Sequence, residues 1–190
     1  MREPQKSKQM KKLFTVLAIL ISFSAHSQNW PIDKETNKIL FTDVIKVDSV
    51  TQNELFVKAN EWFAKTYNDS KEVIQLRDKE SGKIVGKGAF RVYAHLMGIH
   101  DYGLVRYTIK LMIKEGRYKY EICDLYHEFA NSGVGSGGDM MNEKAACGTM
   151  SIPNKQWNEI KTSAFNQTNQ LIESLNSFMT SKNISKKDNW

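Results

Sequence analysis

Residues 105–122, VRYTIKLMIKEGRYKYEI, decide the fold that this sequence predicts. Apolar and polar side chains alternate from Val105 to Lys114, which is typical of a strand with one buried and one solvated face. Glu115-Gly116 then predicts a two-residue turn into a second strand. A shift of one residue would bring Arg117 onto the buried face, so the apolar pattern defines the register. The expected pairs are Ile113 with Tyr118, Leu111 with Tyr120 and Ile109 with Ile122.

Two more strands are expected before this hairpin. Residues 84–97 are rich in β-formers, and residues 72–78 precede them across a turn at Glu80-Ser81-Gly82. The sequence does not define the register of this pair, and Gly86 and Gly88 are candidates for a bulge that shifts it. In the second of these strands the residues expected to point inward are Phe90, Val92, Ala94 and Leu96.

Helices are expected on both sides of these strands. Thr51 and Glu54 form a capping box, and an apolar stripe then continues to about Tyr67. Residues 38–47, before the cap, are predicted to form another strand. A long amphipathic helix is predicted from Pro153 onward. Its stripe consists of Trp157, Ile160, Ala164, Leu171, Leu175 and Phe178, with Phe165, Ile172 and Met179 beside it.

The expected order is therefore strand, helix, four strands and helix. Because each element has one apolar face, this order predicts an α+β fold in which two helices cover one face of an antiparallel sheet of about five strands. With Lys38-Ile39-Leu40-Phe41 and Gly88-Ala89-Phe90 in these strands, residues 38–129 resemble a bacterial secreted family of unknown function. That family is described as having a TATA-box-binding-protein-like (TBP-like) fold. The resemblance implies the fold and transfers no functional residue, and it does not imply DNA binding.

The N-terminus has the features of a secretory signal peptide. Lys11 and Lys12 precede an apolar run over residues 13–21, and Ala25-His26-Ser27 supplies small residues for cleavage. The run is shorter than a bilayer span, so we expect cleavage after Ser27, an extracytoplasmic location (periplasmic or secreted) and no transmembrane anchor. The expected organisation is a signal peptide over residues 1–27, one α+β domain over 28–181 and a polar tail over 182–190.

The expected leader also changes the charge balance. Of the 27 basic and 21 acidic residues, five and one lie in residues 1–27, which leaves a net charge of +2 on the remainder. The basic character of the whole chain therefore comes largely from its leader. Together with the expected location, this balance predicts that nucleic acid is not a partner.

The solvated face of the predicted sheet is the leading candidate site. It collects basic side chains together with Tyr93, and Glu121 is the only acid that the predicted register places on it. We expect this face to bind an anionic or carbohydrate-bearing envelope component, or another envelope protein. The alternative is an inert, solvated sheet face. The candidate binding residues are Lys87, Arg91, Tyr93, Arg106, Lys110 and Lys119, with Lys114, Arg117 and His95 on the same face.

Three histidines would converge at strand ends if the hairpins pair as expected. They are His95, His100 and His127, and Asp101, Asp124 and Glu128 lie nearby in the sequence. Their spacing matches no known ligand motif, so we predict neither a metal nor a cofactor. Asp124 would lie on the apolar face opposite Tyr107, so it is expected either to pair with the Tyr107 hydroxyl or to mark a bulge.

The two cysteines, Cys123 and Cys147, leave three possibilities open. An extracytoplasmic location permits a disulfide between them, and two free thiols are equally compatible with their spacing. The third possibility, an enzyme with a cysteine nucleophile partnered by His127, has the least support because no family signature surrounds either cysteine.

Three classes of function follow from these residues. The first is a non-catalytic binding module, which is favoured because no residue set meets the criteria for catalysis. The second is a carrier of a small apolar ligand between the sheet and the C-terminal helix, and the third is the cysteine enzyme. The carrier would be lined by Tyr107, Tyr118, Tyr120, Tyr126, Phe90 and Trp157, unless these side chains simply fill the core.

Overall fold

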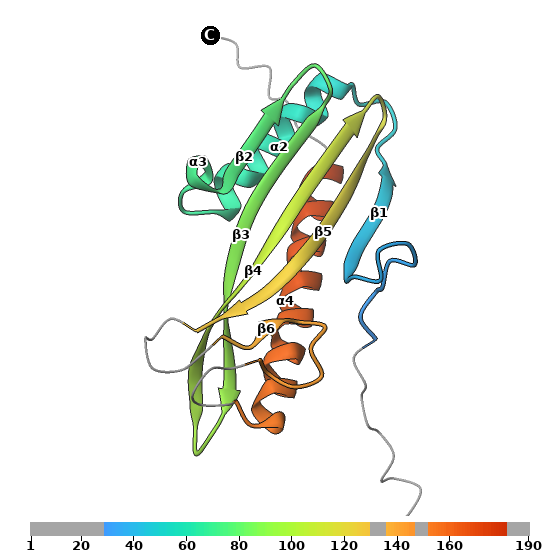
Figure 1. Ribbon diagram of the computed structural model, residues 1–190. Helices are drawn as coiled ribbons and strands as arrows, with labels where there is room; N and C mark the ends of the chain where they lie inside the picture. Colours follow the sequence, from blue (N-terminus) through green and yellow to red (C-terminus); the bar gives the residue numbers. More distant parts are fainter. Residues whose placement is uncertain (1–28, 130–135, 147–151, 182–190) are drawn as a thin grey trace, which may run out of the picture.

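The computed structural model describes residues 29–129, 136–146 and 152–181 (Figure 1). The predicted leader, residues 1–27, and the predicted tail, residues 182–190, lie outside the described residues. The elements in chain order are β1 (Leu40–Lys46), α2 (Gln52–Thr66), α3 (Ser70–Val73), β2 (Ile74–Asp78), β3 (Lys83–His95), β4 (Ile99–Lys114), β5 (Arg117–Glu128), β6 (Gly138–Asp139) and α4 (Asn154–Thr180).

The strands form one antiparallel sheet in the order β1-β5-β4-β3-β2, and the two-residue β6 pairs with β5. Strands β2 to β5 follow one another as a meander, as predicted. The predicted register of the β4–β5 hairpin is also confirmed, because Ile113 lies opposite Tyr118 and Ile109 opposite Ile122. Strand β1 pairs with β5 and forms one edge of the sheet. The local sequence pattern did not predict this long-range pairing.

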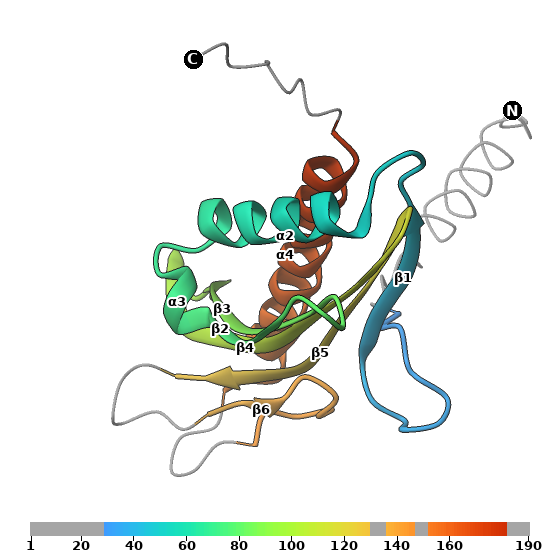
Figure 2. The ribbon, with the colours of Figure 1, turned by 90° about the horizontal axis from the view of Figure 1, so that it is seen from above.

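Helices α2 and α4 both lie on one face of the sheet and leave the other face open (Figure 2). The α+β prediction is therefore confirmed. The core between the two layers contains Trp62 and Phe63 from α2, Trp157 from α4, and Leu111 and Tyr118 from the sheet, all of them fully buried. Among the described residues, no helix combines the length and the apolar character needed to cross a membrane.

Helix α2 begins with the predicted capping box. The Glu54 backbone N–H donates to the Thr51 hydroxyl at 3.2 Å, and the Thr51 backbone N–H donates to the Glu54 carboxylate at 2.8 Å. The carboxylate of Glu115 also accepts from the Gln52 backbone N–H at 2.9 Å. Because Glu115 lies in the β4–β5 turn, this bond fixes the start of α2 to that turn.

Two boundaries differ from the prediction. The segment expected to be a strand from Glu72 begins as one helical turn, α3, because the Asp69 side chain accepts from the backbone N–H groups of Lys71 and Glu72. The strand expected to reach Met97 ends at His95. Leu96, predicted to point inward, is 54% exposed in the turn that follows.

Gly86 and Gly88 have a packing role that the sequence did not predict. A Cβ at Gly88 would come within 2.5 Å of the Tyr107 ring, and one at Gly86 within 2.8 Å of the Phe63 ring. The register shift between β2 and β3 does occur opposite Gly86, between Ile74 and Leu76, whereas Gly88 pairs regularly with Tyr107. The bulge for which these two glycines were candidates is therefore found opposite Gly86, whereas Gly88 makes room for an aromatic ring.

Asp124 marks a bulge, which was one of its two predicted outcomes. The pairing of β4 with β5 shifts between Arg106 and Thr108, and Asp124 lies in the left-handed region with φ 55°. Its predicted pairing with Tyr107 is wrong, because the Tyr107 hydroxyl instead hydrogen-bonds the Tyr67 hydroxyl at 3.0 Å. Burial raises the pKa of Tyr107 to about 12 and also raises the pKa of Tyr67, so both hydroxyls stay protonated at neutral pH.

Candidate functional site

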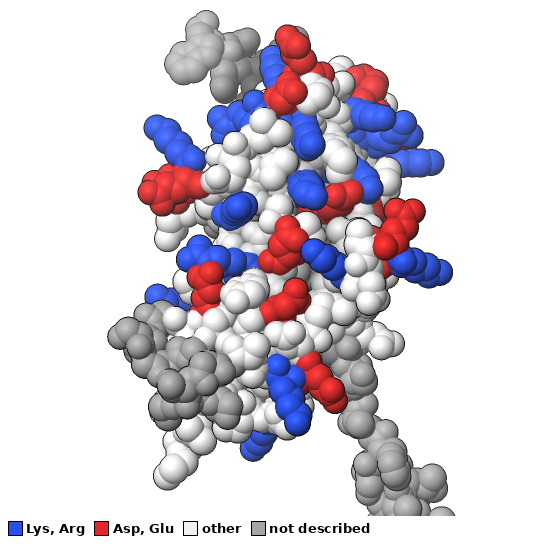
Figure 3. Space-filling view, in the orientation of Figure 1, with Lys and Arg blue, Asp and Glu red and all other residues white. Residues whose placement is uncertain are grey.

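The open face of the sheet carries most of the predicted site residues. Side chains that alternate with the core residues of β3, β4 and β5 point to this face, which Figure 3 views directly. In its middle, red and blue side chains alternate, whereas Lys and Arg gather at the upper right, where β1 meets the β4–β5 turn. Charge on this face is therefore not distributed as the sequence predicted.

Four of the six predicted binding residues are engaged in ion pairs within the chain. Lys119 and Lys110 share the Glu121 carboxylate, at 2.7 and 3.7 Å. Arg106 pairs with Glu128, and Arg91 pairs with Asp101 at 2.6 Å. Glu121 was expected to be the only acid on this face, and this expectation is wrong. Asp101 and Glu128 reach it because bulges shift the register at the ends of β4 and β5.

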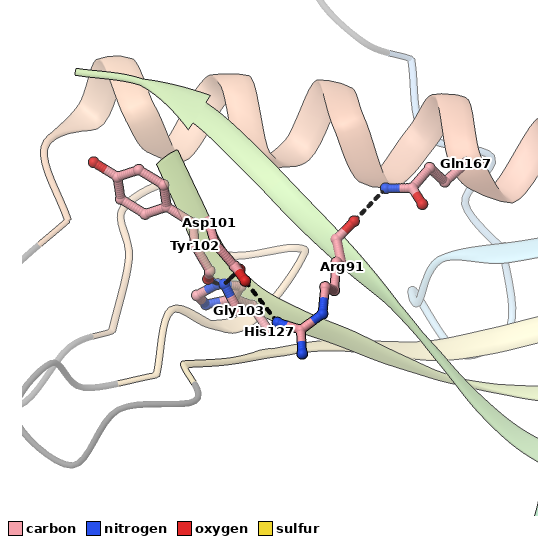
Figure 4. Close-up of polar contacts among 6 residues, drawn as sticks. All are labelled: Arg91, Asp101, Tyr102, Gly103, His127 and Gln167. Carbon is pink, nitrogen blue, oxygen red and sulfur yellow. Dashed lines mark hydrogen bonds and ion pairs between the residues drawn. The ribbon is translucent and has the colours of Figure 1, made fainter. Parts of the chain in front are cut away.

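Arg91 is held by a local network at one of these bulges (Figure 4). The pairing of β3 with β4 shifts after Arg91, and Gly103 has φ 94° there. Asp101 accepts from the Gly103 backbone N–H at 2.8 Å while it pairs with the Arg91 guanidinium. Gln167 of α4 donates to the Arg91 carbonyl at 2.6 Å. Asp101 thus compensates the charge of Arg91 within the chain, without an external partner.

The other two predicted binding residues keep exposed side chains. Lys87 on β3 is exposed and forms no ion pair within the described part of the chain. Tyr93 is 47% exposed near the end of the same strand. They lie on one strand but six residues apart, so they do not form a compact site.

Unpaired cations instead collect in a row at the turn end of the face. Arg117 lies directly opposite Lys46 of β1 and directly opposite Lys114 of β4. Cβ atoms of directly opposed residues are about 5 Å apart, so three positive charges stand side by side across three strands. All three side chains are exposed, and none forms an ion pair with another residue in 29–129, 136–146 or 152–181. We call Lys46, Lys114 and Arg117 the cationic row.

Sequence reasoning found only part of this row. Lys114 and Arg117 were placed on the correct face, but Lys46 was missed because the pairing of β1 with β5 spans more than 70 residues. The alternation Thr42, Val44, Lys46 in β1 was the available signal for the outward face. It could not show which strand lies next to β1.

The three histidines do not converge, contrary to the prediction. His95 lies opposite Ile99 and His127 opposite Val105, which separates them by roughly 20 Å along β4. Within the described residues, no group of three or more His, Cys, Asp or Glu side chains is arranged to hold a metal ion. His100 is exposed, and His95 binds Glu159 of α4 through its ring Nδ1 at 3.1 Å.

His127 is a buried structural residue. Its Nδ1 accepts from the Gly137 backbone N–H at 2.9 Å, so its Nε2 carries the proton and donates to the Tyr102 carbonyl at 2.5 Å. Its ring packs edge-on against Trp157, 5.7 Å between centroids. Burial lowers the pKa of His127, which favours the neutral ring that these two bonds require. Both ring nitrogens are therefore occupied.

Cys123 lacks the surroundings of a nucleophile. Its thiol donates to the Asp124 carboxylate at 3.4 Å, and burial followed by that neighbouring charge raises the pKa of Cys123 to about 11. A reactive cysteine needs a lowered pKa and a basic partner. No described residue forms a disulfide with Cys123, and Cys147 lies outside the described residues, so the disulfide between them stays a prediction.

The aromatic residues proposed to line a ligand cavity mostly fill the core. Tyr107, Tyr118 and Trp157 are buried, and Tyr107 stacks on Phe90 with 5.3 Å between centroids. Tyr120 is also buried, whereas Tyr126 is 45% exposed. A depression of about 240 Å³ lies elsewhere, at the β2 edge beside Leu76. The carrier hypothesis gains no support from these positions.

Comparison with known proteins shows that part of the chain is similar to one family. A family model described as a domain of unknown function (DUF4468) with TBP-like fold matches residues 41–128. Over these residues the chain is similar to that family, which confirms the resemblance predicted from the sequence. The cationic row lies inside the matched residues, whereas α4 lies outside them.

Two of the solved structures that are similar to the chain are the following. A DUF4468 family protein from Bacteroides ovatus has a TM-score of 0.60 at 13% identity, over 80% of this chain and 91% of that chain. A TBP-like protein from Parabacteroides distasonis has a TM-score of 0.52 at 16% identity, over 77% of this chain and 96% of that chain. The comparison with curated proteins gives no match. At these identities the similarity shows the shared fold alone.

Proposed function

We propose that the protein is a non-catalytic binding module of the cell envelope, and that the turn end of its open sheet face recognises an anionic partner. The observation that carries the proposal is the cationic row. Like charges placed directly opposite one another destabilise a sheet, so three unpaired cations side by side have a cost that a bound anion would remove. The contrast with the middle of the face supports this role, because acids there already form ion pairs with Arg91, Arg106, Lys110 and Lys119.

The chemistry of the row favours an extended anion. Its three side chains point to the same solvated face from adjacent strands, and Arg117 in the centre can form two parallel hydrogen bonds to a sulfate, phosphate or carboxylate group. An acidic glycan of the envelope would present such groups in series. The extracytoplasmic location expected from the leader would give the protein access to that ligand.

Heparin, a sulfated polysaccharide, is a suitable probe for this proposal. We expect the protein to bind heparin-agarose and to elute with rising salt, because exposed charges are screened. Changing Lys46, Lys114 and Arg117 together to Gln should weaken heparin binding about tenfold or more, since all three anion contacts are lost.

The matched control removes the same charge elsewhere, by changing Lys34, Lys38 and Lys71 to Gln. These exposed cations lie outside the cationic row, in the segment before β1 and in α3, so they separate a local site from an effect of net charge. Equal elution of the two triple variants, both with wild-type thermal stability, would contradict a site at the row.

A further inference from the structure

A second unusual surface lies at the opposite end of the sheet. Strand β5 ends at Glu128, opposite Leu104, so the ends of β3 and β4 continue beyond it as a projecting two-stranded hairpin (Figure 1, lower end). Its tip is apolar and open to solvent. The exposed fractions are 54% for Leu96, 105% for Met97 and 70% for Ile99. We call Leu96, Met97 and Ile99 the apolar tip.

The conformation of the turn does not explain why its side chains are apolar. Met97 adopts φ 52° and Gly98 adopts φ 139°. A left-handed residue in a solvated turn is ordinarily Asn, Asp or Gly, which adopt that conformation at lower cost. Met97 therefore combines a left-handed backbone conformation with a fully exposed apolar side chain, which contributes no buried surface to the fold.

The base of the hairpin is firmly held. Glu159 of α4 accepts from the His95 backbone N–H at 2.7 Å, and Gln156 donates to the His95 carbonyl at 2.8 Å. On β4, the Tyr102 ring packs edge-on against Phe129. The apolar tip is thus presented by an anchored hairpin, and presenting it to a partner requires little further ordering.

The surroundings of the tip are amphipathic and contain charges of both signs. Arg91 pairs with Asp101, and Glu159 lies against the His95 ring and interacts with Lys155. Tyr93, 47% exposed, and the half-buried Tyr102 flank the hairpin behind the tip. Tyrosine rings are favoured at the boundary between water and a lipid layer, because one end is apolar and the other hydrogen-bonds water.

We propose that the apolar tip inserts into the interface of a lipid bilayer and holds the protein at a membrane surface. The size of the patch decides between a lipid and a protein as its partner. A stable protein interface takes about 20 to 30 residues a side, whereas the tip offers three. A bilayer imposes no minimum area, because binding grows with the apolar surface buried. Since β4 runs for 16 residues, the cationic row would stand roughly 50 Å from this surface.

Vesicle sedimentation tests this inference independently of the anionic ligand. The protein, processed by a secreting bacterial host, is mixed with vesicles of pure phosphatidylcholine at high salt, where the cationic row is screened. We expect the protein to sediment with them. The tip variant, Leu96→Ser with Met97→Asn and Ile99→Thr, should lose about tenfold or more in binding, since three apolar side chains no longer enter the lipid.

Two matched variants complete the experiment. The control variant makes the same kinds of change at other exposed apolar residues, Ile32→Thr, Val57→Asn and Leu76→Ser, and should sediment like wild type. The row variant should also sediment like wild type on neutral vesicles, whereas the tip variant should keep its heparin binding. Either inference can therefore fail without the other.

Several results would overturn the proposal. They are wild-type protein that stays in solution with neutral vesicles, a folded tip variant that sediments as well as wild type, and a tip-dependent dimer in the absence of lipid. The last result would assign the apolar tip to a second copy of the chain.

Discussion

The two hairpins of the meander differ in almost every respect that matters for binding. The β4–β5 hairpin has a regular register next to its turn, and its outer face ends in three unpaired cations. The β3–β4 hairpin is bulged before its turn, its charges are paired, and its tip is apolar. A regular hairpin places side chains where the alternating sequence puts them, whereas a bulge brings distant acids beside basic residues and exposes apolar ones.

The largest expected effect comes from the turn and bulge glycines. At Gly103, φ is 94° and an added Cβ would lie 2.3 Å from the Glu128 carbonyl oxygen, whereas at Gly116, φ is 65° and the nearest atom is 4.0 Å away. Gly103→Ala should therefore lower the free energy of unfolding by about 3 kcal/mol or more. Gly116→Ala should cost only about 1 kcal/mol, the strain of a left-handed alanine. Urea denaturation measures both, and equal losses would show that the two ends do not differ as described.

The second prediction concerns the effect of pH on stability, and it depends on His127 at the bulged end of the sheet. The pKa of His127 is lowered by burial, so the unfolded state binds more protons than the folded state once the pH falls below about 6.5. Stability should be complete above that pH and should decline below it, with a limiting slope of about 1.4 kcal/mol per pH unit for one proton. Protonation also removes the acceptor for the Gly137 N–H, so residues 136–146 should detach first.

The pH effect can be assigned with two variants. Urea denaturation between pH 7.5 and pH 5 should show the decline in wild type and in His100→Gln, because His100 is exposed. The decline should flatten in His127→Gln, even though that variant is less stable throughout. Groups near the His127 ring are Glu128, which opposes the lowering of its pKa, and the uncharged Tyr102 and Trp157. An unchanged decline in His127→Gln would assign the pH dependence elsewhere.

The smallest expected effects come from replacing single cations. One of them belongs to the cationic row and the other to an exposed ion pair. Arg117→Gln removes the middle charge of the cationic row and should stabilise the protein by about 0.5 kcal/mol at low salt. Arg106→Gln breaks an exposed pair with Glu128 and should change stability by no more than about 0.5 kcal/mol, in the opposite direction. Thermal melts at low and high salt resolve the two, since the gain from Arg117→Gln should disappear as salt rises. A destabilising Arg117→Gln would contradict the assignment of repulsion to the row.

This difference also explains how far the sequence could predict the structure. The alternation of residues 105–122 and the Thr51 capping box are local signals, and both were confirmed. The bulges at Gly103 and Asp124 were not predictable in detail, because they interrupt the alternation from which a register is inferred. The pairing of β1 with β5 is non-local, and Lys46 was missed for that reason. The sequence therefore predicted a site in the middle of the face, whereas the unpaired cations lie at its turn end.

The most direct test of the central claim is NMR chemical-shift mapping of the isotope-labelled protein during titration with a heparin oligosaccharide. The account predicts that shifts concentrate at Lys46, Lys114 and Arg117 and at their neighbours on β1, β4 and β5. It predicts little change at Arg91 and Arg106, whose charges are already paired. Shifts centred on Arg91 and Arg106, or no shifts on the open face, would contradict the claim that the unpaired cations at the turn end are the binding site.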